Sequence, residues 1–369
     1  MLVLRSPEDL VPKDHPIRGV KRLADQALKE ISNRLDGLYA EGGRASVPPE
    51  RLLKGMLLMA FYSVRSERLL CEQLSYNLLF RWFLDMDMIE EPFDHSTFSK
   101  NRERLMQHDV AREFFMAVVE QARNAHLTSS EHFTVDGTLI DAWASLKSFK
   151  VKDEATDQRR RERNRRKAER RNQRGGKGGG SNPTVNFRGE KRSNETHEST
   201  TDPESRLARK ADGREAKLSY GAHALMENRN GLLLDFRVSE ANGTCEQTTA
   251  LEMLVEELPG TRQITVGADK HYDSAGFVEI CRTHAISPHV AQNNKNRRSA
   301  IDGRTVRHAG YGVSQRIRKR IEEIFGWLKT TGGFRRTRFK GRLKTQLAAY
   351  MVGAAYNLVR LKKLLPAAA

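Results

Sequence analysis

Residues 315–329, QRIRKRIEEIFGWLK, decide the fold assignment, because they place a charged face beside an apolar stripe on one predicted helix. Counted at about 100° per residue, one face carries Gln315, Arg318, Glu322 and Lys329. A separate apolar stripe carries Ile317, Ile321, Ile324 and Leu328. The stretch therefore predicts a helix that packs one side into a core and presents a carboxylate flanked by cations on another side.

Two aspartates further upstream follow strand-like runs. Asp136 comes after Phe133–Val135, and Asp269 comes after Ile264–Ala268. If the two strands are neighbours, both carboxylates lie at strand ends, where α/β sheets usually place their sites. With Glu322 they form a set of hard oxygen ligands of the kind that suits Mg²⁺. Two such ions can clamp the attacking and leaving oxygens of a phosphoryl transfer.

Each of these carboxylates also has a plainer interpretation. A single aspartate after a strand is more often a turn or cap residue, and Asp141 and Asp273 are local rivals for the two positions. Glu322 is able to pair with Arg318 at i−4, an interaction worth only ~0.3–0.5 kcal/mol. Glu323 flanks the apolar stripe at a similar angle, so helical phase alone leaves the choice between the two glutamates open.

Composition points to a polyanionic partner. The chain has 369 residues and a formal net charge of +17, which favours nucleic acid, with an ordinary basic enzyme as the alternative. No apolar run reaches the ~18 residues that a membrane span needs, and the N-terminus has no secretory apolar region. The cysteines are far apart and predict reduced thiols in a cytoplasmic protein: Cys71, Cys245 and Cys281.

The pattern along the chain predicts two domains. Residues 1–125 carry helical periodicity throughout, and a helix, turn and basic helix within 66–106 suggest, weakly, a helix-turn-helix contact with DNA. Residues 126–365 alternate strands and helices, which predicts an α/β fold, a mixed sheet flanked by helices. The sequence therefore predicts an all-helical N-terminal domain followed by an α/β domain.

A basic segment interrupts the second domain. Residues 150–215 are poor in apolar side chains and include the run QRRRERNRRKAERRNQRGGK at 158–177, so we expect a disordered insertion. It is either a solvated loop or an arm that grips phosphates, and both interpretations hold together. A second basic cluster, residues 329–344, directly follows the helix quoted above and is either a DNA track or an ordinary solvated loop.

Together these motifs resemble bacterial insertion-sequence transposases of the DDE type, and in particular the insertion-sequence-five group. That family's signature spaces Tyr, Arg, Glu and Lys with two, three and six intervening residues. Arg318, Glu322 and Lys329 fit the spacing, and Gln315 departs from it by replacing the Tyr. The signature selects Glu322 over Glu323, while VDGT supplies Asp136 and GADKHYDS supplies Asp269. The resemblance covers nearly the whole chain.

The resemblance implies a ribonuclease H-like catalytic domain in which Asp136, Asp269 and Glu322 are the catalytic residues and metal ligands. They would hold two Mg²⁺ ions, with Mn²⁺ as an alternative. Arg318, Lys329 and Gln315 would bind substrate. The implied enzyme binds the terminal inverted repeats of its element, cleaves DNA and joins the 3′-OH to target DNA. It would act in the cytoplasm, on the nucleoid, as a homodimer or larger assembly.

The main alternative is a DNA-binding regulator, or an inactivated transposase that binds ends without cleavage. The presence of all three candidate carboxylates argues against decay. A second alternative is a ribonuclease H-like nuclease that cuts and does not join.

Overall fold

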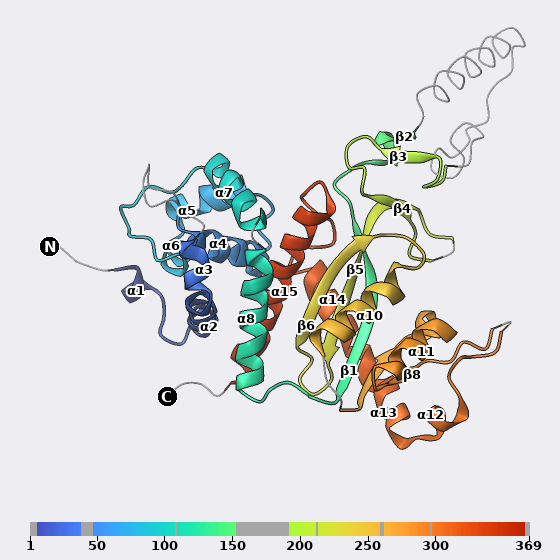
Figure 1. Ribbon diagram of the computed structural model, residues 1–369. Helices are drawn as coiled ribbons and strands as arrows, with labels where there is room; N and C mark the ends of the chain where they lie inside the picture. Colours follow the sequence, from blue (N-terminus) through green and yellow to red (C-terminus); the bar gives the residue numbers. More distant parts are fainter. Residues whose placement is uncertain are drawn as a thin grey trace, which may run out of the picture.

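The computed structural model describes residues 6–37, 47–107, 109–152, 192–211, 213–258, 262–295 and 297–365. The Arg-rich run at 158–177, with the interpretations attached to it, lies outside these residues. Within them the chain forms a helical N-terminal part, one six-stranded sheet with helices on both faces, and a two-stranded sheet. Figure 1 shows the N-terminal helices beside the sheet and α15 between them.

The N-terminal part contains only helices among its described residues, as the sequence predicted. They are α1 (Pro7–Leu10), α2 (Pro16–Glu30), α3 (Ser32–Asp36), α4 (Pro49–Phe61), α5 (Glu67–Tyr76), α6 (Leu78–Phe83), α7 (His95–Gln107) and α8 (Val110–Asn124). In the basic helix α7, Arg102 is buried and forms an ion pair with Glu67 of α5. This leaves Lys100 and Arg104 as the exposed cations of α7.

The large sheet is built around one central strand. Its strands are β1 (His132–Asp141), β4 (Arg206–Ala208), β5 (Lys217–Glu227), β6 (Leu233–Glu240), β7 (Ile264–Ala268) and β8 (Ile286–Val290). β1 pairs antiparallel with β5 on one side and parallel with β7 on the other, and β8 continues the parallel side. β4 and β6 pair in succession with β5. Antiparallel strands on one side of a central strand and parallel strands on the other make this a ribonuclease H-like sheet.

Helices cover both faces of this sheet. They are α10 (Cys245–Glu257), α11 (Ala275–Thr283), α12 (Gly303–Arg307), α13 (Ala309–Ile317), α14 (Ile321–Lys329) and α15 (Arg342–Leu364). Short 3-10 turns accompany them: η1 (Leu146–Ser148), η2 (Lys270–Tyr272) and η3 (Arg318–Arg320). No helix in the described ranges combines the length and apolar character needed to cross a bilayer.

The prediction of a single helix over 315–329 is wrong in one respect. The 3-10 turn η3 separates the end of α13 from α14. α13 packs on β7 and β8, whereas α14 packs on β1 and α15. The two halves therefore follow different surfaces, and the tighter turn lets the chain change direction between them.

The prediction of a disordered insertion over the whole of 150–215 is wrong for part of this range, because strands form inside it. β2 (Phe149–Val151) pairs with β3 (His197–Ser199) in the two-stranded sheet, and β4 joins the large sheet. Phe149 is buried and stacks on His197 with ring centroids 5.4 Å apart. These tertiary contacts supply the apolar burial that local composition does not reveal.

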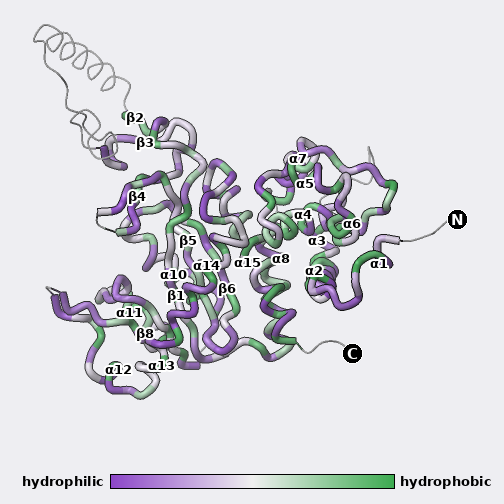
Figure 2. Tube along the Cα trace, turned by 180° about the vertical axis from the view of Figure 1, so that it is seen from behind, coloured by the Kyte–Doolittle hydropathy of each residue, from purple (hydrophilic) through white to green (hydrophobic). Residues whose placement is uncertain are grey.

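The terminal helix α15 joins the two parts of the molecule. It packs on α8, α4 and α2 on one side and on β6 on the other, along the apolar segments visible in Figure 2. Among the described strands β6 has no partner opposite β5, and two side-chain amides of α15 bind its outer edge instead. Asn357 accepts from the Leu233 amide at 2.9 Å and donates to its carbonyl at 2.7 Å, and Gln346 pairs likewise with Val238 and Phe236.

Replacing Asn357 with Leu is expected to destabilise the protein by about 2–4 kcal/mol, because it leaves two buried backbone groups of Leu233 without partners. Urea denaturation measures the loss. Gln346→Leu is the matched control: its side chain is only part-buried, so water replaces the lost bonds and the loss is smaller. Equal losses from both variants would contradict this account of the sheet edge.

Candidate active site

Asp136 lies in the middle of β1 rather than at a strand end, which corrects the sequence prediction. The prediction failed because β1 continues to Asp141 in antiparallel pairing with β5. On the other side, the parallel pairing with β7 stops at Thr134↔Gly267. Asp136 therefore sits where the sheet loses its partner strand, an opening that serves the same purpose as a strand end.

Asp269 directly follows the last residue of β7 and lies beside this opening. Continuing the parallel register by two residues from Thr134↔Gly267 places Asp269 opposite Asp136, on the same face of the sheet. The Asp269 carboxylate accepts a hydrogen bond from the His271 amide at 2.8 Å and caps η2. The structure thus brings the two predicted aspartates together.

The pKa of the Asp136 carboxyl reflects the charged groups around it. Burial raises the pKa of its carboxyl to about 7, and the Gly137 amide, which donates to it at 2.8 Å, opposes this rise. The carboxylates of Asp269 and Glu246 raise its pKa further, and the Arg318 guanidinium lowers it. The site therefore holds excess negative charge.

Helices α13 and α14 cross the sheet on the face that carries Asp136. Gly267 permits this approach, because a Cβ there would lie 3.3 Å from both the Arg318 Cβ and the Thr134 hydroxyl oxygen. Gln315 donates to the His289 carbonyl of β8 at 2.5 Å and accepts from Arg318 Nε at 2.9 Å. Gln315 thus ties the Arg318 side chain to the sheet.

Lys329, at the end of α14, reaches β1 two residues beyond Asp136. Its Nζ donates to the Thr138 hydroxyl at 2.6 Å. Burial lowers the pKa of Lys329 to about 8, and the nearby cations of Lys210 and Arg335 lower it further, while Asp141 opposes them. Lys329 is thus a half-buried cation on the strand that carries the central aspartate.

This lowered pKa predicts a pH dependence of DNA binding. Above about pH 8 the free lysine loses its proton, so binding a phosphate must then take up a proton. We expect the affinity of the wild type, relative to Lys329→Arg, to fall by up to about tenfold per pH unit above this value, because Arg stays charged. Fluorescence anisotropy at constant salt measures both profiles, and parallel profiles would exclude a Lys329–phosphate contact.

Glu322 and Glu323 are both exposed on α14, and they face different neighbours. Glu322 precedes Lys329 by seven residues, which puts the two on one helix face, and Lys329 contacts β1. The charge of Glu323 raises the pKa of Tyr356, so Glu323 faces α15. Among the described contacts Glu322 makes no hydrogen bond or ion pair.

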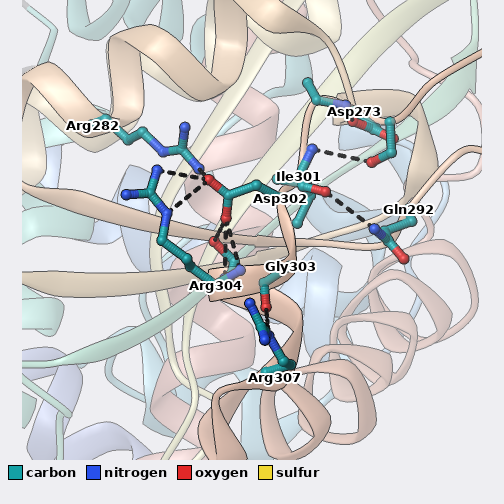
Figure 3. A network of polar contacts seen from close by, with 11 residues as sticks. Asp273, Arg282, Gln292, Ile301, Asp302, Gly303, Arg304 and Arg307 are labelled. Atoms are coloured by element: carbon teal, nitrogen blue, oxygen red, sulfur yellow. Dashed lines mark hydrogen bonds and ion pairs between the residues drawn. The ribbon is translucent and has the colours of Figure 1, made fainter.

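The rival aspartates hold structural positions. Asp273 is buried, and its carboxylate accepts from the backbone amides of Asn293 and Ala300, which fixes the loop that leads to α12. Figure 3 shows Asp273 facing this loop and Asp302 bound by Arg282 and Arg304 at the start of α12. Asp141 pairs with Lys217 at 3.7 Å. The Asp273 carboxylate thus has a structural role in holding this loop.

Two further residues near this site, Glu246 and Tyr272, were not predicted from the sequence. Glu246, in the first turn of α10, occupies the space of an absent side chain at Gly137, where a Cβ would lie 2.7 Å from its carboxylate oxygen. Tyr272 is buried in η2, and its hydroxyl has no hydrogen-bond partner among the described residues. Glu246 lies in no quoted motif, and Tyr272 lies within GADKHYDS, which predicted only Asp269. The packing of α10 on β1 and the burial of Tyr272 reveal them.

The donor set fits a divalent cation. Asp136, Asp269 and Glu246 are part-buried oxygen donors, and no cation of the described residues lies within ion-pair distance of them. Hard carboxylate oxygens with unbalanced negative charge suit Mg²⁺ or Mn²⁺. No three His, Cys, Asp or Glu side chains of the described ranges already stand close enough to hold a metal ion. The carboxylates therefore have to move together to share one.

Comparison with protein families gives two matches. Residues 5–104 match the family described as "Transposase domain (DUF772)", and residues 194–358 match the family described as "Transposase DDE domain". The second match includes Asp269 and Glu322 and begins after Asp136. No curated protein matches the chain.

Solved structures give weaker likenesses. The synaptic complex of piggyBac transposase with hairpin DNA matches at 9% identity and a TM-score of 0.40, over 93% of this chain and 73% of that chain. The Mos1 paired-end complex with the left transposon end matches at 10% identity and a TM-score of 0.21, over 90% of this chain and 86% of that chain.

Proposed function

Because the chain is a DDE transposase with a DUF772 N-terminal domain, we propose that it cuts DNA at the ends of its own insertion sequence. It then joins the freed 3′-OH to target DNA. The observation that supports this most is the juxtaposition of Asp136 and Asp269 under a helix pair that brings Arg318 and Lys329 to the same face. The signature at 318–329 favours the insertion-sequence-five group.

In this proposal Asp136, Asp269 and Glu322 hold Mg²⁺ or Mn²⁺, as DDE transposases typically do. Two ions would activate the attacking oxygen and stabilise charge on the phosphate. Glu322 approaches from α14, between Arg318 near Gly267 and Lys329 at Thr138, which puts it near the level of Asp136. No energy cofactor is needed, because one phosphodiester is exchanged for another.

The cations of this face hold the DNA backbone. Gln315 orients Arg318, and Lys329 lies beside the exposed Arg335. Arg318 and Lys329 therefore lie on either side of Glu322 along the chain. Phosphate bound between them places the scissile bond over Asp136. Gln315 acts as the positioning residue for Arg318 at the place where the family signature has Tyr.

We assign residues 1–125 to DNA binding and residues 126–365 to catalysis. The exposed cations of α7 and the basic segment 329–344 suit the terminal inverted repeats and target DNA. Pairing two ends calls for a dimer or larger assembly on DNA. Its substrates place the protein on the nucleoid in the cytoplasm.

Incubation with a plasmid that carries the gene's native flanking DNA tests this function. Mg²⁺ should give cuts at the element ends and strand-transfer products in a second plasmid, and EDTA should remove both. DNA binding without cleavage under any metal would favour the DNA-binding or inactivated protein instead. Cuts without joined products would indicate a nuclease.

A further inference from the structure

We propose that Glu246 is a fourth carboxylate of this site, which binds the divalent cation together with Asp269 from the α10 face of the sheet. In this proposal the Tyr272 hydroxyl positions the Glu246 carboxylate. This inference rests on the proposed function, since it concerns the same cation. It adds two residues that the DDE signature does not contain.

Glu246 and Glu322 approach β1 from opposite faces. Side chains alternate along a strand, so Thr138 faces α14, where Lys329 binds it, and Gly137 faces α10. Figure 1 shows α10 crossing in front of the strands. Because β7 ends at Ala268, no strand of the described residues pairs with this edge of β1 between Val135 and Asp141, where Arg336 forms a bridge. A carboxylate from the α10 face is able to reach this opening.

Gly137 is the residue that makes this approach possible. A Cβ at this position would lie 2.7 Å from the Glu246 carboxylate oxygen, 2.9 Å from its Cγ and 3.0 Å from its Cδ. Any other side chain would displace the glutamate. The residue next to Asp136 thus leaves space that the Glu246 carboxylate fills.

The N-terminal turn of α10 is also hydrogen-bonded to the segment that follows Asp269. Gln247 donates to the His271 carbonyl at 2.6 Å and accepts from the Ser274 hydroxyl at 2.7 Å. Burial raises the pKa of the Glu246 carboxyl and the charge of Asp269 raises it further, so the two carboxylates lie within electrostatic reach of each other. Part-buried like charges held close together repel one another, and a cation between them removes that repulsion.

The Tyr272 hydroxyl is a second, independent indication of a ligand. It is buried and has no hydrogen-bond partner in the part of the chain that the structure describes, although a buried hydroxyl almost always has one. Burial raises the pKa of this hydroxyl, and the nearby carboxylates of Glu246, Asp136 and Asp269 raise it further. A cation that draws these carboxylates inward would bring an acceptor oxygen, or a water of its own shell, to this hydroxyl.

Mn²⁺ titration of the full-length protein without DNA, followed by electron paramagnetic resonance, tests the proposal. Glu246→Gln is expected to weaken Mn²⁺ binding by about tenfold or more, and Tyr272→Phe by about tenfold. Glu252→Gln is the matched control, because Glu252 is exposed on the same helix and its loss changes net charge equally. The control should bind Mn²⁺ as the wild type does.

Thermal unfolding of the metal-free protein separates a positioning role from a structural one. Tyr272→Phe keeps the ring contact with Phe277 and removes only the unpartnered hydroxyl, so its melting temperature should equal or exceed that of the wild type. A lower melting temperature together with unchanged Mn²⁺ affinity would show that the hydroxyl serves packing alone.

The outcomes distinguish this inference from the proposed function. Wild-type Mn²⁺ affinity in Glu246→Gln, beside a clear loss in Asp269→Asn, would overturn the role of Glu246 and leave the transposase proposal standing. No Mn²⁺ binding by the unsubstituted protein would contradict both.

Discussion

Asp136→Asn is expected to reduce DNA cleavage by at least about 10²-fold, the scale on which a single preorganised charged group acts. The amide keeps the shape of the side chain and removes the charge at the centre of the carboxylate cluster. Binding to DNA ends should change little, because the cations of the face remain. Cleavage of end-bearing DNA and electrophoretic mobility shift measure the two effects separately.

Stability provides a second readout for this variant. Removing a part-buried charge that repels Asp269 and Glu246 should leave the melting temperature of the metal-free protein unchanged or higher. Asp141→Asn is the matched control on the same strand, and its ion pair with Lys217 is worth at most about 1 kcal/mol, so cleavage should stay near wild type. Comparable losses of cleavage in both variants would refute the assignment of Asp136.

Glu322→Gln is expected to reduce cleavage by at least about 10²-fold, whereas Glu323→Gln should stay within about threefold of the wild type. Both side chains are exposed neighbours on α14, so the two variants match in chemistry and accessibility. They differ in direction, because Glu322 shares the face of Lys329 toward β1 and Glu323 faces Tyr356 of α15.

The assay for the two glutamates compares initial cleavage rates at saturating Mg²⁺ with retained binding to the same DNA. A larger loss from Glu323→Gln, or equal losses, would transfer the ligand role and undo the use of the signature spacing. Rescue of Glu322→Gln by Mn²⁺ would support its place among the metal ligands.

Local sequence pattern determined the secondary structure closely where apolar periodicity was strong. The N-terminal helices and the buried strand β7 form where helical periodicity and a strand-like run predicted them. Periodicity reports which side of an element is buried, and this property survives in almost any packing. The same pattern did not reveal η3, because α13 and α14 follow different surfaces.

The candidate site divides in the same way. Strand-like runs in the sequence predicted Asp136 and Asp269, and helical spacing predicted Arg318 and Lys329. The structure gathers their charges around one face. Their motifs are short and local, so each is visible in a single stretch of chain. The assignment of Glu322 remains a prediction that the two glutamate variants decide.

Glu246 and Tyr272 belong to what tertiary structure alone decided. No quoted motif contains Glu246, and GADKHYDS contains Tyr272 without marking it. Both lie near Asp136 because α10 packs on β1 and η2 directly follows β7. Whether Asp273 or Asp269 is free for chemistry also depended on packing, since the backbone amides of Asn293 and Ala300 donate to the Asp273 carboxylate. The sequence determined which residues carry charge at regular spacing, whereas long-range strand pairing decided which carboxylates are left unpaired, because register brings together residues more than a hundred positions apart.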